Sequence, residues 1–506
     1  MSGSPGLTAL HQRLVAVRSE LLPAPAPAAS GHLAEDTAQL LHALVGSLAD
    51  DPSRARVWLL LVAMSATFPL DDEVRATQRH LELNSVSASM SWLLEGSWSA
   101  ATDRRSGTSH IRLVRDGVVV DVDYAAKHDL QTGVQRVVRR LAPRWHAEHD
   151  VQLAVWTEPT GALRELVPDE QERVLRWARP LNRQTSPPVD PVVVVPWRSC
   201  VVLPEVPGTE QCARLASLAE HSGNRVAVVG HDCIPVVMAD LLPVEEPTKF
   251  VRYLSLVKHV DLVAAVSDSA AREFRGFTHA LATQGLPGPQ VVTCRNGVDE
   301  HQAGAGDRPG DGRSSAAQPG VPEVLVVGSH EPRKNHLAVL YAAEVLWREG
   351  VQFRLRFVGS SGWSTTRFDQ RLASLRKAGR PVVAERGLDD DALWAAFRQA
   401  TFSMFPSLHE GYGLPVVESL AVGTPVIGTS YGSIAEVGAE GGVLLVDPRD
   451  EDALAAAMRL LLTDPHELEQ LRRSALDRPH RSWDDHAREL WETAVEARAA
   501  RVPQEA

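Results

Sequence analysis

Two carboxylates, Glu410 and Glu418, frame a short stretch whose composition suits a polar, anionic ligand. The apolar run 401–405 before them predicts a strand, and Pro415 fits the first turn of a helix, where its missing N–H leaves no donor unsatisfied. Glu410 is therefore expected on a loop at the carboxyl end of a strand, and Glu418 about one turn into the helix. Because the first amides of a helix have no intrahelical acceptor, they can bind an anion. The two carboxylates, which accept hydrogen bonds from hydroxyl groups, are then expected on either side of this anion site.

Glycines in the same stretch favour close approach of a ligand to the backbone. Gly411 and Gly413 lie between the two acids and carry no side chain that would hold a ligand away. The simpler interpretation, that both acids are solvated surface charges, stays open at this point. The acidic run Asp389–Asp391 stands at the start of a helical pattern, so we interpret it as a helix cap and not as a metal site.

The elements that must position these residues alternate regularly after residue 323. Apolar runs separated by helical patterns predict a parallel sheet that is covered on both faces. The expected strands are 323–328, 353–359, 381–387, 401–407, 425–430 and 442–448.

The preceding part of the chain repeats this alternation less clearly. A strand, a turn and a strand are expected within 111–122. Further strands are expected at 151–156, 191–197, 225–230, 261–267 and 290–297. Residues 1–108 show apolar positions at helical spacing and predict a helical accessory region, which we interpret as a module that docks a partner or dimerises.

The segment 301–322 is rich in Gly, Pro, Ser and Asp and predicts an interdomain linker. The expected fold class is therefore α/β, with two doubly wound, Rossmann-like parallel-sheet domains at 109–300 and 323–480. Ligands of open α/β sheets bind at the carboxyl ends of the strands, so two such domains facing a cleft are expected to share one deep site.

Composition narrows the class of function. The 506-residue chain has a net charge of −12, which argues against a dedicated nucleic-acid binder. Its four cysteines lack zinc-ligand spacing, so we expect neither a structural metal nor a disulfide framework, and a reducing cytoplasm is favoured. The N-terminus lacks the pattern of a signal peptide, and the most apolar run, 57–68, is too short to cross a bilayer.

The stretch 406–427 resembles the Glu-x7-Glu signature of retaining GT-B glycosyltransferases of family GT4. The resemblance continues in order through further blocks, at 324–346, 355–362, 387–407 and 432–458. It is thinner in the first half, where it covers 121–141, 230–243 and 261–274, and is most similar to the mannosyltransferase branch that elongates bacterial surface polysaccharides. It implies the GT-B fold, here with an N-terminal helical extension, and a C-terminal helix within 481–506 that packs back on the first domain.

The resemblance also implies roles for individual residues. Glu418 is expected to take the ribose hydroxyls and Glu410 the hydroxyls of the donor sugar. Arg333 and Lys334 match the basic pair that neutralises the diphosphate, and fixed cations beside a leaving diphosphate stabilise the transition state. The loop 411–414 is expected to hold the sugar and the distal phosphate through its backbone. The implied donor-binding residues are Gly133, Gly328, Leu388, Gly411, Tyr412, Gly413, Leu414 and Glu418.

Three residues of the first domain carry two interpretations each. Gly133 matches the family's glycine loop facing the diphosphate, or it only opens a helix. His231 matches the catalytic histidine near the donor sugar, or it is a hydrogen-bonded structural histidine. Asp232 orients the acceptor, or it caps a helix or turn.

Leu388, in the second domain, lies where the base of the nucleotide is expected to rest on backbone and apolar contacts.

A helical pattern after Gly133 places Arg136, Arg139 and Arg140 on one face. This face either meets an anionic membrane or lipid-linked acceptor, or is simply solvated.

The expected function is transfer of a sugar, with mannose as a candidate, from a GDP- or UDP-linked donor to a hydroxyl of a glycan, lipid-linked or small-molecule acceptor. The resemblance implies retention by a same-face mechanism without an essential metal or other cofactor, and a cytoplasmic enzyme with a peripheral contact at the inner face of the membrane. Two alternatives remain: a phosphorylase or sugar-nucleotide epimerase on the same fold, and a non-catalytic subunit that binds sugar nucleotides.

Overall fold

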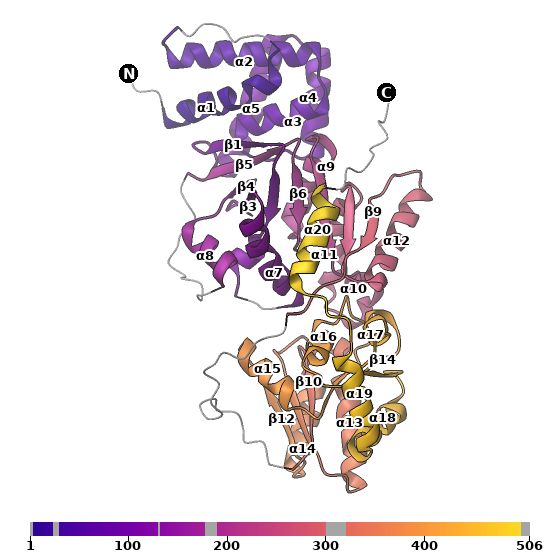
Figure 1. Ribbon diagram of the computed structural model, residues 1–506. Coiled ribbons are helices and arrows are strands. Elements are labelled where there is room, and N and C mark those ends of the chain that lie inside the picture. Colours follow the sequence, from indigo (N-terminus) through magenta and orange to yellow (C-terminus); the bar gives the residue numbers. More distant parts are fainter. Residues whose placement is uncertain (1–3, 24–29, 130–131, 178–189, 300–319, 497–506) are drawn as a thin grey trace.

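A computed structural model of the chain describes residues 4–23, 30–129, 132–177, 190–299 and 320–496. It has a helical region at one end, a sheet domain in the middle and a second sheet domain at the other end (Figure 1). Apart from its last residues, the expected linker 301–322 lies outside the described residues.

The helical region contains five helices and is joined closely to the middle domain. Helix α3 is almost wholly apolar, and most of its side chains are buried, together with Phe68 and Trp156, in a core that also includes the middle sheet. Arg13 in α1 is buried as well and donates to the carbonyl oxygens of Ala63 (2.7 Å) and Met64 (2.9 Å), while burial lowers its pKa to about 10. The helices are α1 Pro5–Leu21, α2 Leu33–Asp50, α3 Arg54–Ser65, α4 Asp71–Leu83 and α5 Val86–Asp103.

The middle domain is built on a nine-stranded sheet in the order β1-β5-β4-β3-β2-β6-β7-β8-β9. The expectation of a wholly parallel sheet is wrong here, because β4 runs antiparallel to both β3 and β5. The two strands within 111–122 do form, but they do not pair with each other: β1 pairs with β5, and β2 pairs with β3 and β6. The strands are β1 His110–Arg115, β2 Val118–Asp121, β3 Val151–Trp156, β4 Leu163–Glu165, β5 Val192–Trp197, β6 Cys200–Leu203, β7 Arg225–Gly230, β8 Leu262–Ala265 and β9 Gln290–Thr293.

Helices of the middle domain cover this sheet with their apolar faces. The long helix α7 buries Val137, Val138 and Leu141 at helical spacing and begins directly in front of the second sheet domain. The helices are α6 Asp123–Lys127, α7 Gly133–Glu148, α8 Pro168–Arg176, α9 Thr209–His221, α10 Ile234–Val237, the 3₁₀ turn η1 Ala239–Leu241, α11 Glu245–Val257 and α12 Asp268–Ala282.

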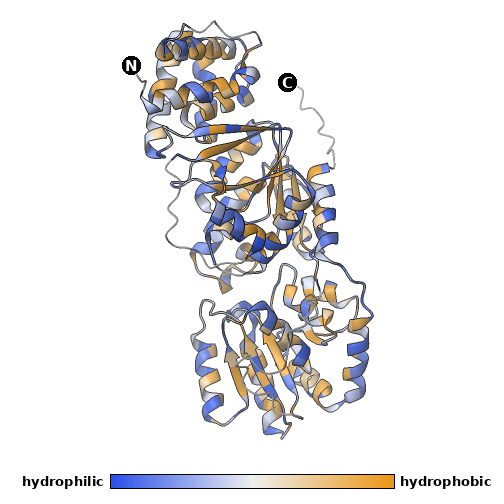
Figure 2. Cartoon of the chain, turned by 60° about the vertical axis from the view of Figure 1, so that its left-hand side comes forward, coloured by the Kyte–Doolittle hydropathy of each residue, from blue (hydrophilic) through white to orange (hydrophobic). Residues whose placement is uncertain are grey.

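The second sheet domain contains six parallel strands in the order β12-β11-β10-β13-β14-β15. Its strands are apolar while its covering helices are two-sided, as the colouring of Figure 2 shows. The strands are β10 Glu323–Val327, β11 Arg354–Val358, β12 Val382–Glu385, β13 Phe402–Phe405, β14 Val426–Thr429 and β15 Val443–Val446. The helices are the 3₁₀ turn η2 Pro332–Lys334, α13 His336–Arg348, α14 Thr366–Lys377, α15 Asp390–Gln399, α16 Leu414–Ala421, α17 Gly432–Gly438, α18 Glu451–Thr463 and α19 Pro465–Leu476.

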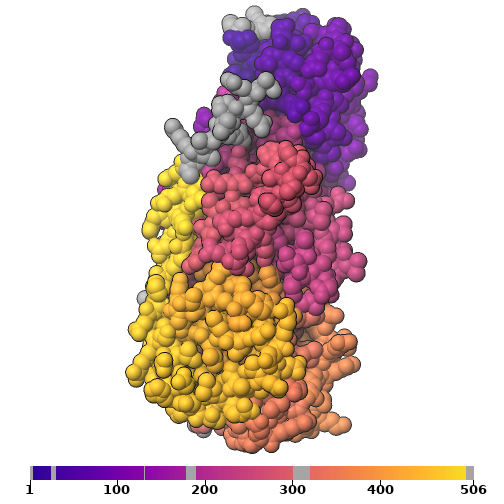
Figure 3. Space-filling model, turned by 90° about the vertical axis from the view of Figure 1, so that its right-hand side faces the viewer, coloured from indigo at the N-terminus to yellow at the C-terminus, as the bar shows by residue number. Residues whose placement is uncertain are grey.

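The last helix, α20 Trp483–Trp491, returns to the middle domain and packs against α7 (Figure 1). The indole Nε1 of Trp145 in α7 donates to the Ala487 carbonyl oxygen at 3.0 Å. Gly297 accommodates the crossing chain, because a Cβ at this position would lie 2.2 Å from the Ser482 oxygen. In the space-filling view the segment in yellow runs along both domains (Figure 3), so it ties them together. Every helix in the described part of the chain is too short or too polar to cross a membrane.

Candidate active site

Two loops of the second sheet domain bring an acid and two cations together. The loops follow neighbouring strands, β10 and β13, and the Leu408 amide donates to the Arg333 carbonyl oxygen at 2.8 Å. Arg333 Nη1 lies 3.0 Å from Glu410 Oε2, and Lys334 Nζ lies 2.5 Å from Glu410 Oε1. Both cations therefore hold one carboxylate, and all three side chains are at most 14% exposed.

Electrostatics favour the charged forms of Glu410 and Arg333. Burial alone would raise the pKa of Glu410, but Lys334 and Arg333 outweigh burial and lower it to about 2. Burial would likewise lower the pKa of Arg333, whereas Glu410 and Glu331 raise it above its ordinary value. At neutral pH the site thus presents two fixed cations at the carboxyl end of a parallel sheet, where phosphate-bearing ligands bind.

Glu418 meets a cation from the other domain. It lies in α16, and its Oε1 atom accepts from Nη1 of Arg136 in α7, 282 residues away in the chain. Its Oε2 atom is buried and has no hydrogen-bond partner within the described residues. Burial raises the pKa of Glu418, while Arg136 opposes that effect. We refer to Arg333, Lys334, Glu410, Glu418 and Arg136 as the interface cluster.

Glycines let the two domains approach along this cluster. A Cβ on Gly411 would lie 2.2 Å from the His231 carbonyl oxygen, so only glycine permits the contact of the two backbones. Gly413 precedes α16 with φ +97°, a conformation that favours glycine. Across the interface, Gly133 at the start of α7 lies close to Leu414, since a Cβ there would be 3.7 Å from Leu414 Cδ1.

Gly328 and Leu388 lie at the ends of two other strands of the second domain. Gly328 follows β10 with φ +147° and faces the Lys334 side chain, 3.5 Å from the position of an added Cβ. Leu388 follows β12, is partly buried and packs against the apolar core next to α16. Asp389 accepts from the Ala392 amide at 2.8 Å and caps α15, which confirms the interpretation of the acidic run as a helix cap.

His231 and Asp232 lie at the carboxyl end of β7, facing the interface cluster. His231 Nε2 donates to the Pro204 carbonyl oxygen at 2.8 Å, and burial lowers the pKa of His231 to about 4. The ring is therefore neutral at physiological pH. Burial raises the pKa of Asp232, whose Oδ1 accepts from the Ile234 amide at 3.0 Å and so caps a turn directly before α10. The hydrogen bonds thus match the structural interpretation of both residues, although both border the interface.

The tyrosine of the glycine-rich loop points away from the anion site. The Tyr412 hydroxyl donates to the Asn296 carbonyl oxygen at 2.9 Å, and burial raises its pKa to about 12. The side chain thus joins the second domain to the chain segment after β9, and only its backbone lies beside Gly411 and Gly413.

The three arginines do not form one simply solvated face, while contact of this face with a membrane or lipid-linked acceptor stays a prediction. Arg136 is engaged by Glu418, and Arg139 stacks on the ring of Trp177. Only Arg140 keeps a looser contact, 3.9 Å from a carboxylate oxygen of Asp299. The helix face was foreseen from the spacing, but its partners come from distant segments.

Further contacts across the interface had no local signal in the sequence. The Ser267 hydroxyl donates to the Gly411 carbonyl oxygen at 2.6 Å, and Trp363 Nε1 donates to the Leu241 carbonyl oxygen at 2.8 Å. His409 Nε2 lies 2.6 Å from Glu273 Oε1. These contacts hold the loops after β11 and β13 against the middle domain.

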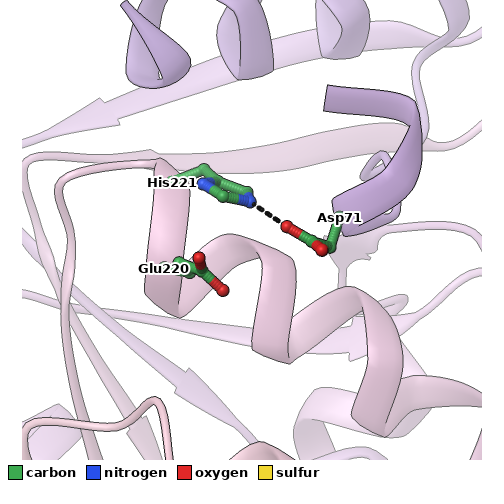
Figure 4. Close-up of side chains that lie close together, drawn as sticks. All are labelled: Asp71, Glu220 and His221. Carbon is green, nitrogen blue, oxygen red and sulfur yellow. Dashed lines mark hydrogen bonds and ion pairs between the residues drawn. The ribbon is translucent and has the colours of Figure 1, made fainter. Parts of the chain in front are cut away.

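A second group of charged side chains lies far from this interface, between the helical region and α9. Asp71 at the start of α4 faces Glu220 and His221 at the end of α9 (Figure 4). We call these three residues the helix cluster. His221 Nε2 lies 2.7 Å from Asp71 Oδ1, and Arg75 pairs with both Asp71 (2.7 Å) and Glu220 (2.8 Å). The group has the spacing of metal ligands, but Arg75 already supplies the positive charge.

Two Rossmann-like domains, with the loops at the carboxyl ends of their strands facing each other, define the GT-B class. Residues 307–478 match the family described as "Glycosyl transferases group 1". The chain therefore has the GT-B fold, and its C-terminal domain matches the glycosyl transferases of group 1.

The chain is also similar to named bacterial proteins. It is 26% identical over 324 residues to the "Serotype-specific mannosyltransferase WbdA" of Escherichia coli, and the match covers 61% of this chain and 38% of WbdA. It is 36% identical over 147 residues to the "O-antigen chain mannosyltransferase B" of Escherichia coli, covering 28% of this chain and 36% of that protein. The chain thus spans well under half the length of these relatives.

A solved structure supports the fold. The N-terminal domain of trehalose-6-phosphate phosphatase from Candida albicans superposes with a TM-score of 0.51 over 74% of this chain and 95% of that one. At 14% identity the likeness concerns the fold alone.

Proposed function

We propose that the chain is a retaining, GT4-like glycosyltransferase that moves a sugar, with mannose the first candidate, from a GDP- or UDP-linked donor to an acceptor hydroxyl. One observation carries the proposal: a buried carboxylate held by Arg333 and Lys334 directly precedes α16, the helix that carries Glu418, whose Oε2 has no partner among the described residues. Cations and helix amides suit a diphosphate, and the two acids suit hydroxyls on either side of it.

In this proposal the bound donor replaces the ion pairs that Glu410 makes with Arg333 and Lys334 in the structure. The diphosphate takes up the charge of Arg333 and Lys334, and Glu410 turns from these cations towards a hydroxyl of the donor sugar. As the glycosidic bond breaks, negative charge grows on the diphosphate, and the two cations stabilise it without reorganising. Among the residues that the structure describes, we assign no carboxylate as a covalent nucleophile, and we propose that the leaving phosphate deprotonates the acceptor on the same face.

The histidine of the middle domain has a defined part in this scheme. Because His231 donates through Nε2 to Pro204 and is neutral, its Nδ1 atom has a lone pair and can only accept a hydrogen bond. We propose that His231 orients a hydroxyl of the sugar or acceptor and does not transfer a proton. Asp232, next to it, orients the acceptor while it keeps its hydrogen bond from the Ile234 amide.

The metal requirement, the acceptor and the cellular location of the protein are also proposals. The cation pair offers the charge that a metal ion would otherwise supply, so we propose that no essential metal is needed. The mannosyltransferase relatives favour a glycan acceptor in polysaccharide synthesis. A cytoplasmic location, a peripheral membrane contact and a docking role of helices α1 to α5 stay predictions.

The decisive test offers a panel of GDP- and UDP-linked sugars to the purified protein and follows the products. Sustained release of nucleoside diphosphate, with an α-linked product from an α-linked donor, supports the proposal. Turnover that requires inorganic phosphate but no nucleotide identifies a phosphorylase, and conversion of the donor without release identifies an epimerase. Binding of a donor without any turnover leaves the non-catalytic subunit.

A further inference from the structure

The ion pair between Arg136 and Glu418 joins the two domains inside the proposed donor site. Arg136 belongs to α7 of the middle domain, and Glu418 to α16 of the second sheet domain. The Glu418 side chain is only 7% exposed, and that of Arg136 is 26% exposed. Since the partners lie on different domains, the pair exists only while the domains are closed on each other.

The two oxygens of the Glu418 carboxylate are used differently. Oε1 accepts from Arg136, whereas Oε2 is buried and has no partner among the described residues. Buried acceptors are normally satisfied in native proteins. The unpaired oxygen thus indicates a hydrogen-bond donor that arrives with a ligand.

Arg136 is also the nearest source of positive charge for Glu418. Of the other charged groups that act on this carboxylate, Asp390 at the start of α15 disfavours its charge, and Arg140 lies farther along α7. Asp390 itself lies 3.8 Å from Arg136 Nη2. A buried carboxylate without a counterion takes up a proton, and a protonated carboxyl is a weaker acceptor for a hydroxyl.

We propose that Arg136 is a positioning residue for the ribose of the donor, an inference that rests on the proposed function. By holding Oε1, it favours the charged form of Glu418 and directs Oε2 at a ribose hydroxyl. The middle domain thereby contributes to recognition of the nucleotide without touching it. Selection of a ribose over a sugar without the 2′ and 3′ hydroxyls thus depends on domain closure.

The test compares the affinities of UDP and GDP with those of their 2′,3′-dideoxy analogues, measured by calorimetry. The wild type is expected to prefer the hydroxylated nucleotide by about tenfold or more, the value of a hydrogen bond to a charged group. Arg136→Ala should bring this preference close to one, and Arg136→Lys should retain most of it. Arg140→Ala, one turn along the same helix, is the matched control and should behave like the wild type.

The other binding results count against the inference, and a variant that does not fold is replaced by another. If Arg136→Ala weakens both nucleotides equally and keeps the preference, Arg136 acts on the phosphates or on folding only, and the inference is overturned. If Arg136→Ala does not fold, Arg136→Gln replaces it, with the same expected loss. If the wild type binds UDP or GDP without preferring the hydroxyls, the inference fails while nucleotide binding stands. If it binds neither, the proposed function fails as well.

Discussion

The interface cluster and the helix cluster contain the same kinds of residue in different settings. In each, two carboxylates pair with at least one arginine. In the interface cluster the side chains of Glu410 and Glu418 are 14% and 7% exposed, whereas those of Asp71 and Glu220 are 48% and 25% exposed. The interface acids lie beside glycines and strand ends, and the helix cluster joins the start of one helix to the end of another.

This difference teaches which features of a charged cluster indicate a ligand. In the helix cluster both carboxylates have cationic or histidine partners, so the charges satisfy each other and stabilise a contact between two elements. In the interface cluster Glu418 keeps a buried oxygen without a partner among the described residues, and Gly411 lets the loop pack closely against the other domain. A buried, incompletely satisfied carboxylate at the domain interface, and not the presence of charge, marks the candidate site.

The largest expected effect comes from removing a cation of the interface cluster. Lys334→Ala should lower donor-dependent release of nucleoside diphosphate by about 100- to 1,000-fold, the usual loss for one group that stabilises a developing anion. Lys377→Ala, on the exposed end of α14, is the matched control and should leave the rate unchanged. A Lys334→Ala protein that is folded and fully active would remove the proposed role of the cation pair.

Glu418→Gln should affect donor binding more than the chemical step. The substitution keeps the shape of the side chain but removes the charge that strengthens its hydrogen bonds, so KM for the donor should rise about 10- to 100-fold with a smaller change in kcat. Steady-state kinetics with varied donor measures both values. An unchanged KM would show that Glu418 only pairs with Arg136.

The pH dependence of stability distinguishes Glu410 from an ordinary surface acid. Its pKa is lowered to about 2 from 4.5, so its contribution to stability is complete above about pH 4.5 and is lost as the pH falls towards 2. Between pH 6 and 3.5 the wild type should lose about 1 kcal/mol more unfolding free energy than Glu410→Gln. Urea unfolding at the two pH values measures this, and equal losses in both proteins would contradict the ion-pair account.

The smallest effect is expected in the helix cluster. Asp71→Asn should lower the unfolding free energy by about 1 kcal/mol or less, since the pair is partly solvated, and should leave donor turnover unchanged. Asp72→Asn, its exposed neighbour, is the control for the loss of a negative charge at the start of α4. A loss of turnover in Asp71→Asn, or in wild type treated with a chelator, would favour a metal-binding function of this cluster.

The sequence predicted those strands whose own residues show a clear apolar pattern. The apolar runs 151–156 and 225–230 coincide with β3 and β7, because a buried strand must be apolar throughout. The three-residue β4 is too short to show a pattern, and β6 follows β5 too closely to be separated from it. Pairing of β1 with β5 was not predictable either, since register between distant strands is set by tertiary packing.

The same division holds for the site. Glu410, Arg333 and Lys334 were expected in one site and do lie together, because their loops follow neighbouring strands of one domain, but their ion pairs were not predicted. Arg136 was misread as part of a surface, because its partner lies in another domain. The direction of the Tyr412 side chain was likewise not predictable, since it depends on Asn296, which lies outside that domain's sheet.

A crystal structure of the protein with bound UDP or GDP tests the central claim most directly. The account predicts a ribose hydroxyl on Glu418 Oε2, the diphosphate beside Arg333, Lys334 and the first amides of α16, and Arg136 still on Glu418 Oε1. A nucleotide bound away from this interface, or one whose ribose leaves Glu418 untouched while the phosphates lie far from the cation pair, would contradict it.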